Sequence, residues 1–447
     1  MEYAAPLAMC GVLLLGIFTG YPVAFVLAGI GVLTAFVADV PLVFLSTGVS
    51  RTFSGILSNW LLIAVPLFVF MGLMLEKSGI AQRLLRSMAG LMGSLPGGYA
   101  FAVTIIGIVM AASTGIIGAS VTLMGVLALP AMLKNRYDPR LSTGVIAATG
   151  TLGILIPPSI MLVVLGDQMR ISVGDLFAGA LVPGLLLGVL YLLYLAWLAL
   201  FHPHAMPPLP PSERLRPGRV MVQLLRDLVA PAVLIVLVLG SIIVGVATPT
   251  EAAGLGAAGA FLLALISREL TWAVFVDTLR ETTRTTAMIM FVMIGATVFS
   301  VIFRKLGGDA MIADYLGVTD GSASPYWVLT VVMVFLFVLG MFLDWVEITF
   351  IVMPIIAPII AGLDFGIPSD QVLLWFAILF AVNLQTSFLT PPFGYALFYI
   401  RGVAPPDLPT RTIYAGIVPF VALQIVGLVL VIVFPQLALW LPQLLLG

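Results

Sequence analysis

Apolar segments recur along the whole chain, and several reach the roughly 20 residues that a helix needs to cross the hydrocarbon core of a bilayer. Twelve such segments lie between residues 5 and 441, separated by polar loops. Hydrophobic residues make up 62% of the 447 positions and charged residues 9%, too little polar surface for a soluble globule. The short alternating segments of a β-barrel are absent. The sequence therefore predicts an all-α polytopic membrane protein.

Two of the apolar segments, 141–165 and 371–400, are interrupted by glycines and by a Pro-Pro pair. Pro157-Pro158 recurs 234 residues later as Pro391-Pro392. Because proline removes an N–H and clashes with the preceding turn, nearby carbonyls lose their helical partners. A bilayer tolerates such groups only beside protein or a wet cavity. Two broken helices at matching places in two halves predict the binding site of a transporter.

Loops at matching places in the two halves carry opposite net charge. Residues 76–86 and 134–140 each carry net +2, whereas their counterparts 304–320 and 361–370 carry −1 and −2. Cytoplasmic loops are enriched in Lys and Arg, so equivalent loops are expected on opposite faces of the membrane. This predicts two repeats of inverted topology. The alternative, that four short loops differ in sign by chance, stays open.

The loop charges also predict how many segments cross the membrane. If the two basic loops are cytoplasmic, segment 98–133 between them is a re-entrant helical hairpin, and segment 325–361 is one from the other side. Two full crossings are the alternative, but limbs of about 16 residues barely reach across. The other ten segments then cross fully, which puts both termini in the periplasm. The repeats are residues 1–200 and 228–447, joined by a cytoplasmic Arg-rich linker, 201–227.

Several other features limit the function. The polar stretch 40–60 fits an arm helix lying in the membrane interface. Cys10 is the single cysteine, so neither an intrachain disulfide nor a cysteine metal site can form. The chain has no Gly-rich loop with Lys for ATP and no basic cluster for nucleic acid. No catalytic constellation is present, and an enzyme is not expected.

The turns of the hairpins contain the residues that could carry the chemistry. Gly115 and Ser120 lie in the first turn, where small residues let backbone approach a ligand. Asp344 and Glu347, in the second turn, are the only acids deep in an apolar segment of that half. Three residues apart, they could share a helical face toward a ligand. Alternatively, Asp344 is the N-cap and Glu347 its capping-box partner.

A hairpin turn that faces a broken helix offers carbonyls and hydroxyls, which suit a dehydrated hard cation. Na⁺ is expected, because such a cage needs no titrating group, whereas proton coupling would need an acid or a histidine. The N-termini of the second half-helices carry partial positive charge and unpaired N–H groups. They predict an anionic substrate.

Four passages together resemble the large membrane subunit of TRAP (tripartite ATP-independent periplasmic) transporters over essentially the whole chain: 150–159, 245–252, 343–349 and 383–394. The resemblance implies Na⁺ symport of an organic anion by an elevator mechanism in the bacterial inner membrane. C4-dicarboxylates, sialic acids and other carboxylates are the expected substrates. It also implies a periplasmic substrate-binding protein and a separate small four-helix membrane subunit.

The family's binding residues can be carried over by position. One Na⁺ site is expected at Gly115, Ser120, Gly150, Gly153 and Pro157, and a second at Gly340, Asp344, Gln385, Thr386 and Thr390. The substrate is expected against Ser120, Asp344, Glu347, Gln385 and Thr390. The first turn is poorer in Ser and Ala than the common family pattern, so a dicarboxylate is not assigned.

Three other functions fit parts of the sequence. The runner-up is a self-sufficient ion-coupled carboxylate transporter of the same architecture, which would need no binding protein. A passive channel is disfavoured because re-entrant hairpins with paired breaks make closed sites. A membrane-embedded enzyme lacks a nucleophile or metal set to accompany Asp344 and Glu347.

Replacing Gly153 with Val tests the first break. The added side chain is expected to close the backbone approach there, so the variant should insert normally yet lose transport. Membrane insertion and uptake in proteoliposomes are the measurements, and normal uptake would count against the site.

Overall fold

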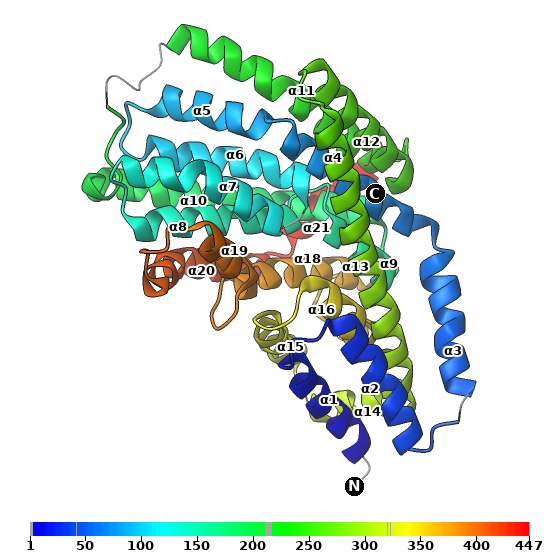
Figure 1. Cartoon of the computed structure of the whole chain (residues 1–447). Helices are drawn as coiled ribbons and strands as arrows, with labels where there is room; N and C mark the ends of the chain where they lie inside the picture. Colours follow the sequence, from blue (N-terminus) through cyan, green and yellow to red (C-terminus); the bar gives the residue numbers. More distant parts are fainter. Residues whose placement is uncertain are drawn as a thin grey trace.

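The computed structural model describes residues 3–41, 43–115, 117–210, 217–319, 321 and 323–446 (Figure 1). No β-strand occurs in these residues, and the all-α prediction is confirmed. The first half contains α1 (Ala4–Ile17), α2 (Val23–Val37), α3 (Val43–Thr52), α4 (Ala64–Lys77), α5 (Ile80–Met92), α6 (Gly98–Thr114), α7 (Ile117–Lys134), α8 (Pro139–Thr151), α9 (Ile160–Met169) and α10 (Val173–Phe201). The second half contains α11 (Pro217–Ile243), α12 (Pro249–Ile266), α13 (Trp272–Lys305), α14 (Gly308–Tyr315), α15 (Pro325–Gly340), α16 (Trp345–Ile351), α17 (Met353–Ala361), α18 (Ser369–Phe388), α19 (Tyr395–Val403), α20 (Thr410–Val433) and α21 (Gln436–Leu446).

Seven helical stretches in the described part of the chain are long and apolar enough to cross a bilayer. They are Trp60–Lys77, Ile117–Lys134, Val173–Phe201, Pro249–Ile266, Trp272–Lys305, Ser369–Phe388 and Thr410–Val433. The chain is therefore a multi-pass membrane protein. The count of ten full crossings stays a prediction.

The hairpins expected at 98–133 and 325–361 are helix pairs. Helices α6 and α7 join at Gly115, and α15 joins α16 and α17 through residues 341–344. The limbs α6, α7 and α15 contain 17, 18 and 16 residues, which makes them about 24 to 27 Å long. Lengths below the roughly 30 Å hydrocarbon core favour re-entry. Helix α7 is nevertheless among the stretches that could cross, so re-entry stays a prediction.

Both expected breaks are present. Helix α8 ends at Thr151, a 3₁₀ turn follows, and the helix resumes as α9 at Ile160. Helix α18 ends at Phe388 and resumes as α19 at Tyr395. Both Pro-Pro peptide bonds are cis.

Two segments that the sequence analysis treated as charged loops contain helices. Within 76–86, Gly79 turns the chain with a φ of +66° and α5 begins at Ile80. Within 304–320, Gly307 does the same with a φ of +82° before α14. In α5 the apolar residues fall on one buried face, and the charges that suggested a loop lie outside that face.

Two helices begin earlier than their apolar segments suggest. Helix α11 begins at Pro217, inside the expected linker 201–227, where proline suits the first position of a helix. The linker's residues 211–216 lie outside the described residues. Helix α13 begins at Trp272 rather than near 284, because the Thr271 hydroxyl accepts a hydrogen bond from the N–H of Val274 (3.2 Å) and caps it.

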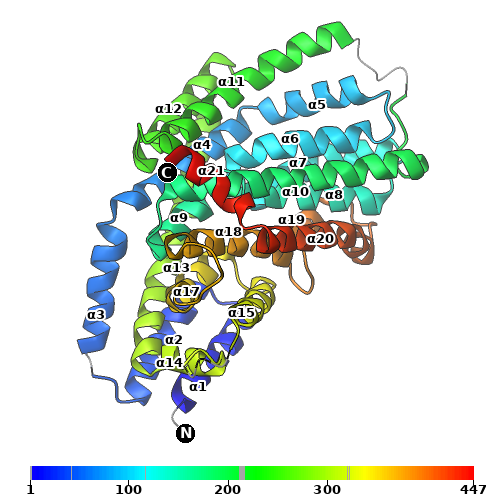
Figure 2. The ribbon, with the colours of Figure 1, turned by 180° about the vertical axis from the view of Figure 1, so that it is seen from behind.

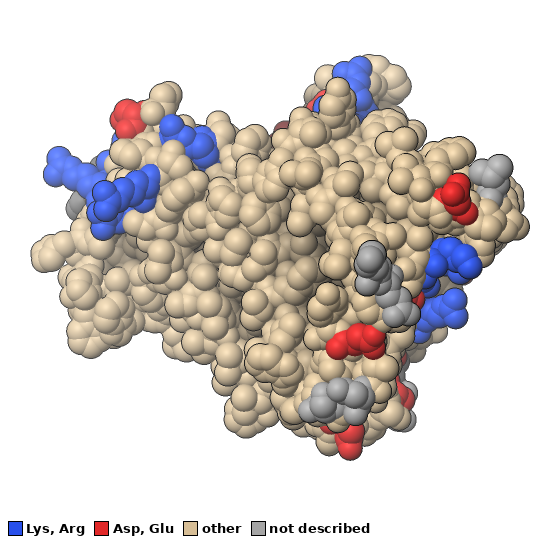
Figure 3. All heavy atoms as spheres, turned by 90° about the horizontal axis from the view of Figure 1, so that it is seen from below, with Lys and Arg blue, Asp and Glu red and all other residues tan. Residues whose placement is uncertain are grey.

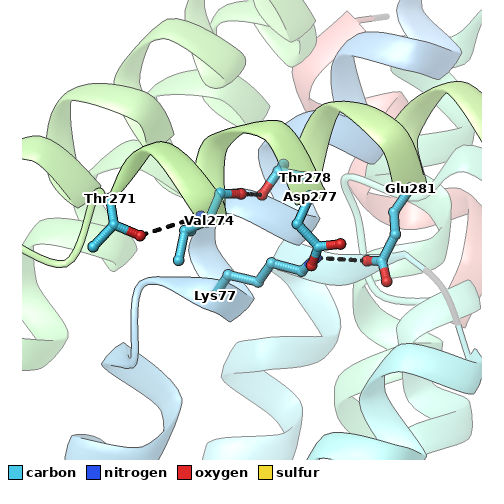
Figure 4. A network of polar contacts seen from close by, with 6 residues as sticks. All are labelled: Lys77, Thr271, Val274, Asp277, Thr278 and Glu281. Atoms are coloured by element: carbon cyan, nitrogen blue, oxygen red, sulfur yellow. Dashed lines mark hydrogen bonds and ion pairs between the residues drawn. The ribbon is translucent and has the colours of Figure 1, made fainter.

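Helix α13 is 34 residues long and packs along α2 and α4 (Figures 1 and 2). Near its start, Asp277 and Glu281 form ion pairs with Lys77 at the end of α4, the latter at 2.9 Å (Figure 4). Near its end, Lys305 lies 4.5 Å from the ring centre of Phe44 in α3. The expected arm at 40–60 is α3, a π-turn and the Asn59-capped turn that leads into α4.

Helices of the two halves pack against each other through glycines. At the crossing of α8 and α20, a Cβ on Gly416 would lie 2.1 Å from the carbonyl oxygen of Arg140. At the crossing of α10 and α18, a Cβ on Gly179 would lie 3.5 Å from a side-chain carbon of Ile378. The face in Figure 3 is uncharged over its wide middle, with Lys, Arg, Asp and Glu gathered toward its edges, as a membrane requires.

Replacing Gly416 with Ala is expected to destabilise the protein by about 1–3 kcal/mol, because the clash is with backbone that cannot rotate away. The apparent Tm in detergent should fall. Gly240→Ala in α11 is the matched control, since no heavy atom lies within 4 Å of its Cβ and alanine favours helix. Equal effects of the two substitutions would contradict the tight α8–α20 crossing.

Candidate functional site

The first hairpin turns directly against the second half of the first broken helix. Gly115 has a φ of +59°, and a Cβ there would lie 3.4 Å from the backbone nitrogen of Ile160, the first residue of α9. Ser120 is buried in the first turns of α7. A Cβ on Gly150 would lie 3.1 Å from the backbone nitrogen of Val121. The structure therefore brings the first turn and the first break together, as predicted.

The first break satisfies part of its own backbone. The Ser159 hydroxyl donates a hydrogen bond of 2.6 Å to the carbonyl of Ile154, which the prolines leave without a helical donor. Gly153 and Pro157 lie in this buried stretch. Neither of them belongs to the lining of the central cavity defined below.

The second hairpin turns against the end of α18. A Cβ on Gly340 would lie 2.2 Å from the Ser387 hydroxyl oxygen, so the two segments are in close contact. The hydroxyls of Thr386 and Thr390 donate to the carbonyls four residues earlier, Val382 (3.3 Å) and Thr386 (2.7 Å). These hydroxyl oxygens keep lone pairs that could accept a cation.

Gln385 stands out in this second site. Its side chain is fully buried, and in the described structure neither its amide nitrogen nor its amide oxygen has a hydrogen-bond partner. Leaving a buried amide unsatisfied costs about 1–3 kcal/mol. A ligand that bonded to the Gln385 amide would remove this cost, so Gln385 is the strongest candidate in α18 for a ligand contact.

Both interpretations of the acid pair are compatible with the structure. The Asp344 carboxylate accepts a hydrogen bond of 2.8 Å from the N–H of Trp345 and caps α16. Asp344 and Glu347 also line one cavity. The Oε2 atom of Glu347 is buried and has no hydrogen-bond partner among the described residues.

That cavity, of about 200 Å³, lies where both hairpin turns meet both broken helices and α13. It is called the central cavity below. Its lining comprises Gly115, Ile117, Gly118, Ile160, Thr285, Met288, Ile289, Val292, Asp344, Trp345, Val346, Glu347, Tyr395 and Tyr399. Of the predicted binding residues, it gathers Gly115, Asp344 and Glu347. Gly150, Gly340, Ser120, Gln385, Thr386 and Thr390 lie outside its lining.

Two groups of lining residues were missed from the sequence. Helix α13 supplies one wall, including Thr285 and Met288, and nothing in its apolar pattern sets that face apart. Tyr395 and Tyr399 come from α19, and their spacing of four places both rings on one face of that helix. That spacing, directly after the Pro-Pro pair, is a signal that could have found them.

A family model described as the DctM component of tripartite ATP-independent periplasmic transporters matches residues 10–437. The chain is 30% identical over 436 residues to the sialic acid TRAP transporter large permease protein SiaM of Vibrio cholerae, covering 96% of this chain and 97% of that protein. It is 32% identical over 387 residues to the C4-dicarboxylate TRAP transporter large permease protein DctM of Pseudomonas aeruginosa, covering 86% and 87%.

A solved structure has a similar fold. The crystal structure of the YdaH transporter of Alcanivorax borkumensis matches 98% of this chain and 99% of that one, with a TM-score of 0.56 and 17% sequence identity. At this identity the likeness concerns the fold alone.

Replacing Gln385 with Leu tests whether its amide is held for a ligand. Because the amide has no partner in the described structure, Gln385→Leu should leave the apparent Tm unchanged or higher without Na⁺. The variant should also reduce the stabilisation by Na⁺, because one of the two expected Na⁺ sites loses a ligand. Thermal unfolding with and without Na⁺ is the measurement.

The matched control is Gln424→Leu. The Gln424 amide nitrogen donates to the Tyr191 hydroxyl (2.8 Å) and the Thr151 hydroxyl (3.3 Å), so its loss should lower the Tm while the Na⁺ response persists. A large loss of stability in Gln385→Leu without Na⁺ would mean that the amide is already satisfied.

Proposed function

Because the chain belongs to the DctM family, the large membrane subunits of tripartite ATP-independent periplasmic transporters, we propose that it imports an organic anion by symport with Na⁺. The resemblance drawn from the sequence is confirmed, and the chain is a transporter subunit rather than an enzyme. The observation that carries the proposal is the central cavity, where both hairpin turns and both broken helices converge.

Charge balance in the central cavity supports cation coupling. An anion there would meet the N-terminus of α9 at Ile160, but also the carboxyl groups of Asp344 and Glu347. Like charges in so small a volume repel strongly. A cation held next to the acids would offset that repulsion, so anion and cation would enter together. This argument favours symport over the transport of a lone anion.

Two places could hold the cation. The first turn lies against the first break, and the second turn lies against α18 beside the unsatisfied Gln385. The proposed Na⁺ ligands are those named from the sequence, with Gly115, Ser120, Gly150, Gly153 and Pro157 in one cage and Gly340, Asp344, Gln385, Thr386 and Thr390 in the other. Carbonyl and hydroxyl oxygens are ligands for hard cations.

The proposed motion is an elevator. Helices α2, α4, α12 and α13 pack on one another and would form the scaffold, whereas α6 to α9 and α15 to α19 contain the hairpins and broken helices and would move together. The order of hairpin and broken helix recurs in residues 1–200 and 228–447, which supports a repeat, and the opposite loop charges support its inversion. The central cavity lies between these groups, lined by α13 on the scaffold side.

The family also supports the proposed partners. A periplasmic binding protein would deliver the substrate, and a small four-helix subunit would complete the assembly in the inner membrane, with both termini of this chain in the periplasm. Similarity to permeases named for sialic acid and for C4-dicarboxylates supports a carboxylate. The second candidate is a self-sufficient ion-coupled carboxylate transporter of the same architecture, which would need no binding protein.

The experiment that tests Na⁺ coupling is thermal unfolding of the purified chain with its small subunit, titrating NaCl against choline chloride at constant ionic strength. A ligand that binds only the folded state raises stability with its concentration. A saturable, Na⁺-specific rise in Tm is expected, and identical curves in the two salts would contradict the cation sites. In proteoliposomes, uptake of succinate or sialic acid should then need both a Na⁺ gradient and the binding protein.

A further inference from the structure

A second cavity, larger and polar, lies beside the central cavity. Its volume is about 690 Å³, and it is called the outer cavity below. Its walls come from the α3 arm, the C-terminal end of α9, the second half of α13, and the segment from α16 to α18. The lining residues with polar side chains are Arg51, Ser54, Asn59, Asp167, Gln168, Arg170, Thr297, Ser300 and Arg304.

The charge of the outer cavity is positive. Arg51, Arg170 and Arg304 come from three separate elements, and Asp167 is the one acid in the lining. The Asp167 carboxylate already accepts hydrogen bonds from the amide groups of Asn59 and of Gln168 (2.9 Å). None of the ion pairs in the described structure involves any of the three arginines.

Arg304 has hydrogen-bond donors that no described residue accepts. One of its terminal nitrogens donates to the Ser300 hydroxyl (3.3 Å), while its Nε is buried without a hydrogen-bond partner in the described residues. A guanidinium presents five N–H donors in a planar fork that matches a carboxylate. The group that best completes this site is therefore an anion with two oxygens in one plane.

Three elements contribute to the lining of both cavities. Helix α9 lines the central cavity with its first residue and the outer cavity with residues 167–169 at its end. Helix α13 lines the central cavity with residues from 285–292 and the outer cavity with residues from 297–304. The returning limb of the second hairpin lines the central cavity with residues 344–347 and the outer cavity with residues from 350–358. In all three the central cavity comes first and the outer cavity follows toward the same end of the molecule.

We infer that the outer cavity is an anion-binding vestibule in which Arg51, Arg170 and Arg304 hold a carboxylate group on its way to the central cavity. The inference rests on the proposed function, of which it names an earlier binding step. On the proposed topology the vestibule faces the periplasm, where a binding protein would release the substrate. Its positive charge then raises the local concentration of the anion before that anion meets the acid pair.

The test measures the electrostatic potential of the cavity and needs no transport. On a Cys10→Ser background, Ser54→Cys places a thiol in the outer cavity. Ser46→Cys places one in α3 of the same arm, outside the lining. The rates of modification by an anionic sulfonatoethyl and a cationic trimethylammonioethyl methanethiosulfonate are compared in phosphatidylcholine nanodiscs. The anion-to-cation rate ratio at Ser54→Cys is expected to exceed that at Ser46→Cys about tenfold.

Arginine substitutions test whether the three arginines cause the difference in rate ratio. Changing Arg51, Arg170 and Arg304 together to Gln should abolish the tenfold difference, whereas Arg411→Gln, outside the lining, should leave it unchanged. If the triple variant fails to fold, Arg170→Gln alone should still lower the ratio about twofold. Equal ratios at positions 46 and 54 in the parent protein would overturn the inference.

Protection separates the sources of the anion. Succinate or sialic acid should slow modification at Ser54→Cys, and only when the three arginines are present. Protection by phosphatidylglycerol alone would assign the site to a lipid headgroup, and protection by substrate-free binding protein alone would assign it to protein docking. Either result would overturn the vestibule. A positive cavity in a protein that imports neither carboxylate would instead contradict the proposed function.

Discussion

The structure depends on two stretches of backbone that cannot be helical and yet lie inside an apolar protein. At each break a side-chain hydroxyl donates a hydrogen bond to a backbone carbonyl of the same segment. Ser159 does so in the first break and Thr390 at the second. A hairpin turn packs against each break. At the second break the approach is so close that a Cβ on Gly340 would lie 2.2 Å from the Ser387 hydroxyl oxygen. The buried amide of Gln385 has no hydrogen-bond partner in the described structure, and a bound ligand could supply one.

Covering the breaks also interlocks the two halves. The first hairpin returns through α7, which packs on α19 of the second half. A Cβ on Gly118 in α7 would lie only 2.5 Å from the Tyr399 ring in α19. The second hairpin returns through α16 and α17, which pack on α9 of the first half. Both halves therefore contribute to the lining of the central cavity, and neither half closes it alone.

The halves agree in architecture but differ in charge. The first turn and first break contain no acid, whereas the second turn carries Asp344 and Glu347 into the central cavity. The arginines lie in the outer cavity, near the far ends of α9 and α13. An anion following the proposed route would therefore pass from a positive cavity to one that contains carboxyl groups, where the proposed Na⁺ would offset the repulsion.

The membrane class, the two helix pairs, the two breaks and the acid pair could be predicted from the sequence, because they follow from apolar length, proline chemistry and charge, which are local properties. The starts of α5, α11 and α13 could not, because their charged residues lie on helix faces that are recognisable only once the helices are packed. The folded structure was needed to show that α13, Tyr395 and Tyr399 line the central cavity and that Arg51, Arg170 and Arg304 line the outer one. Those residues are brought together by contacts between distant segments, and a linear pattern carries no record of which helix faces meet.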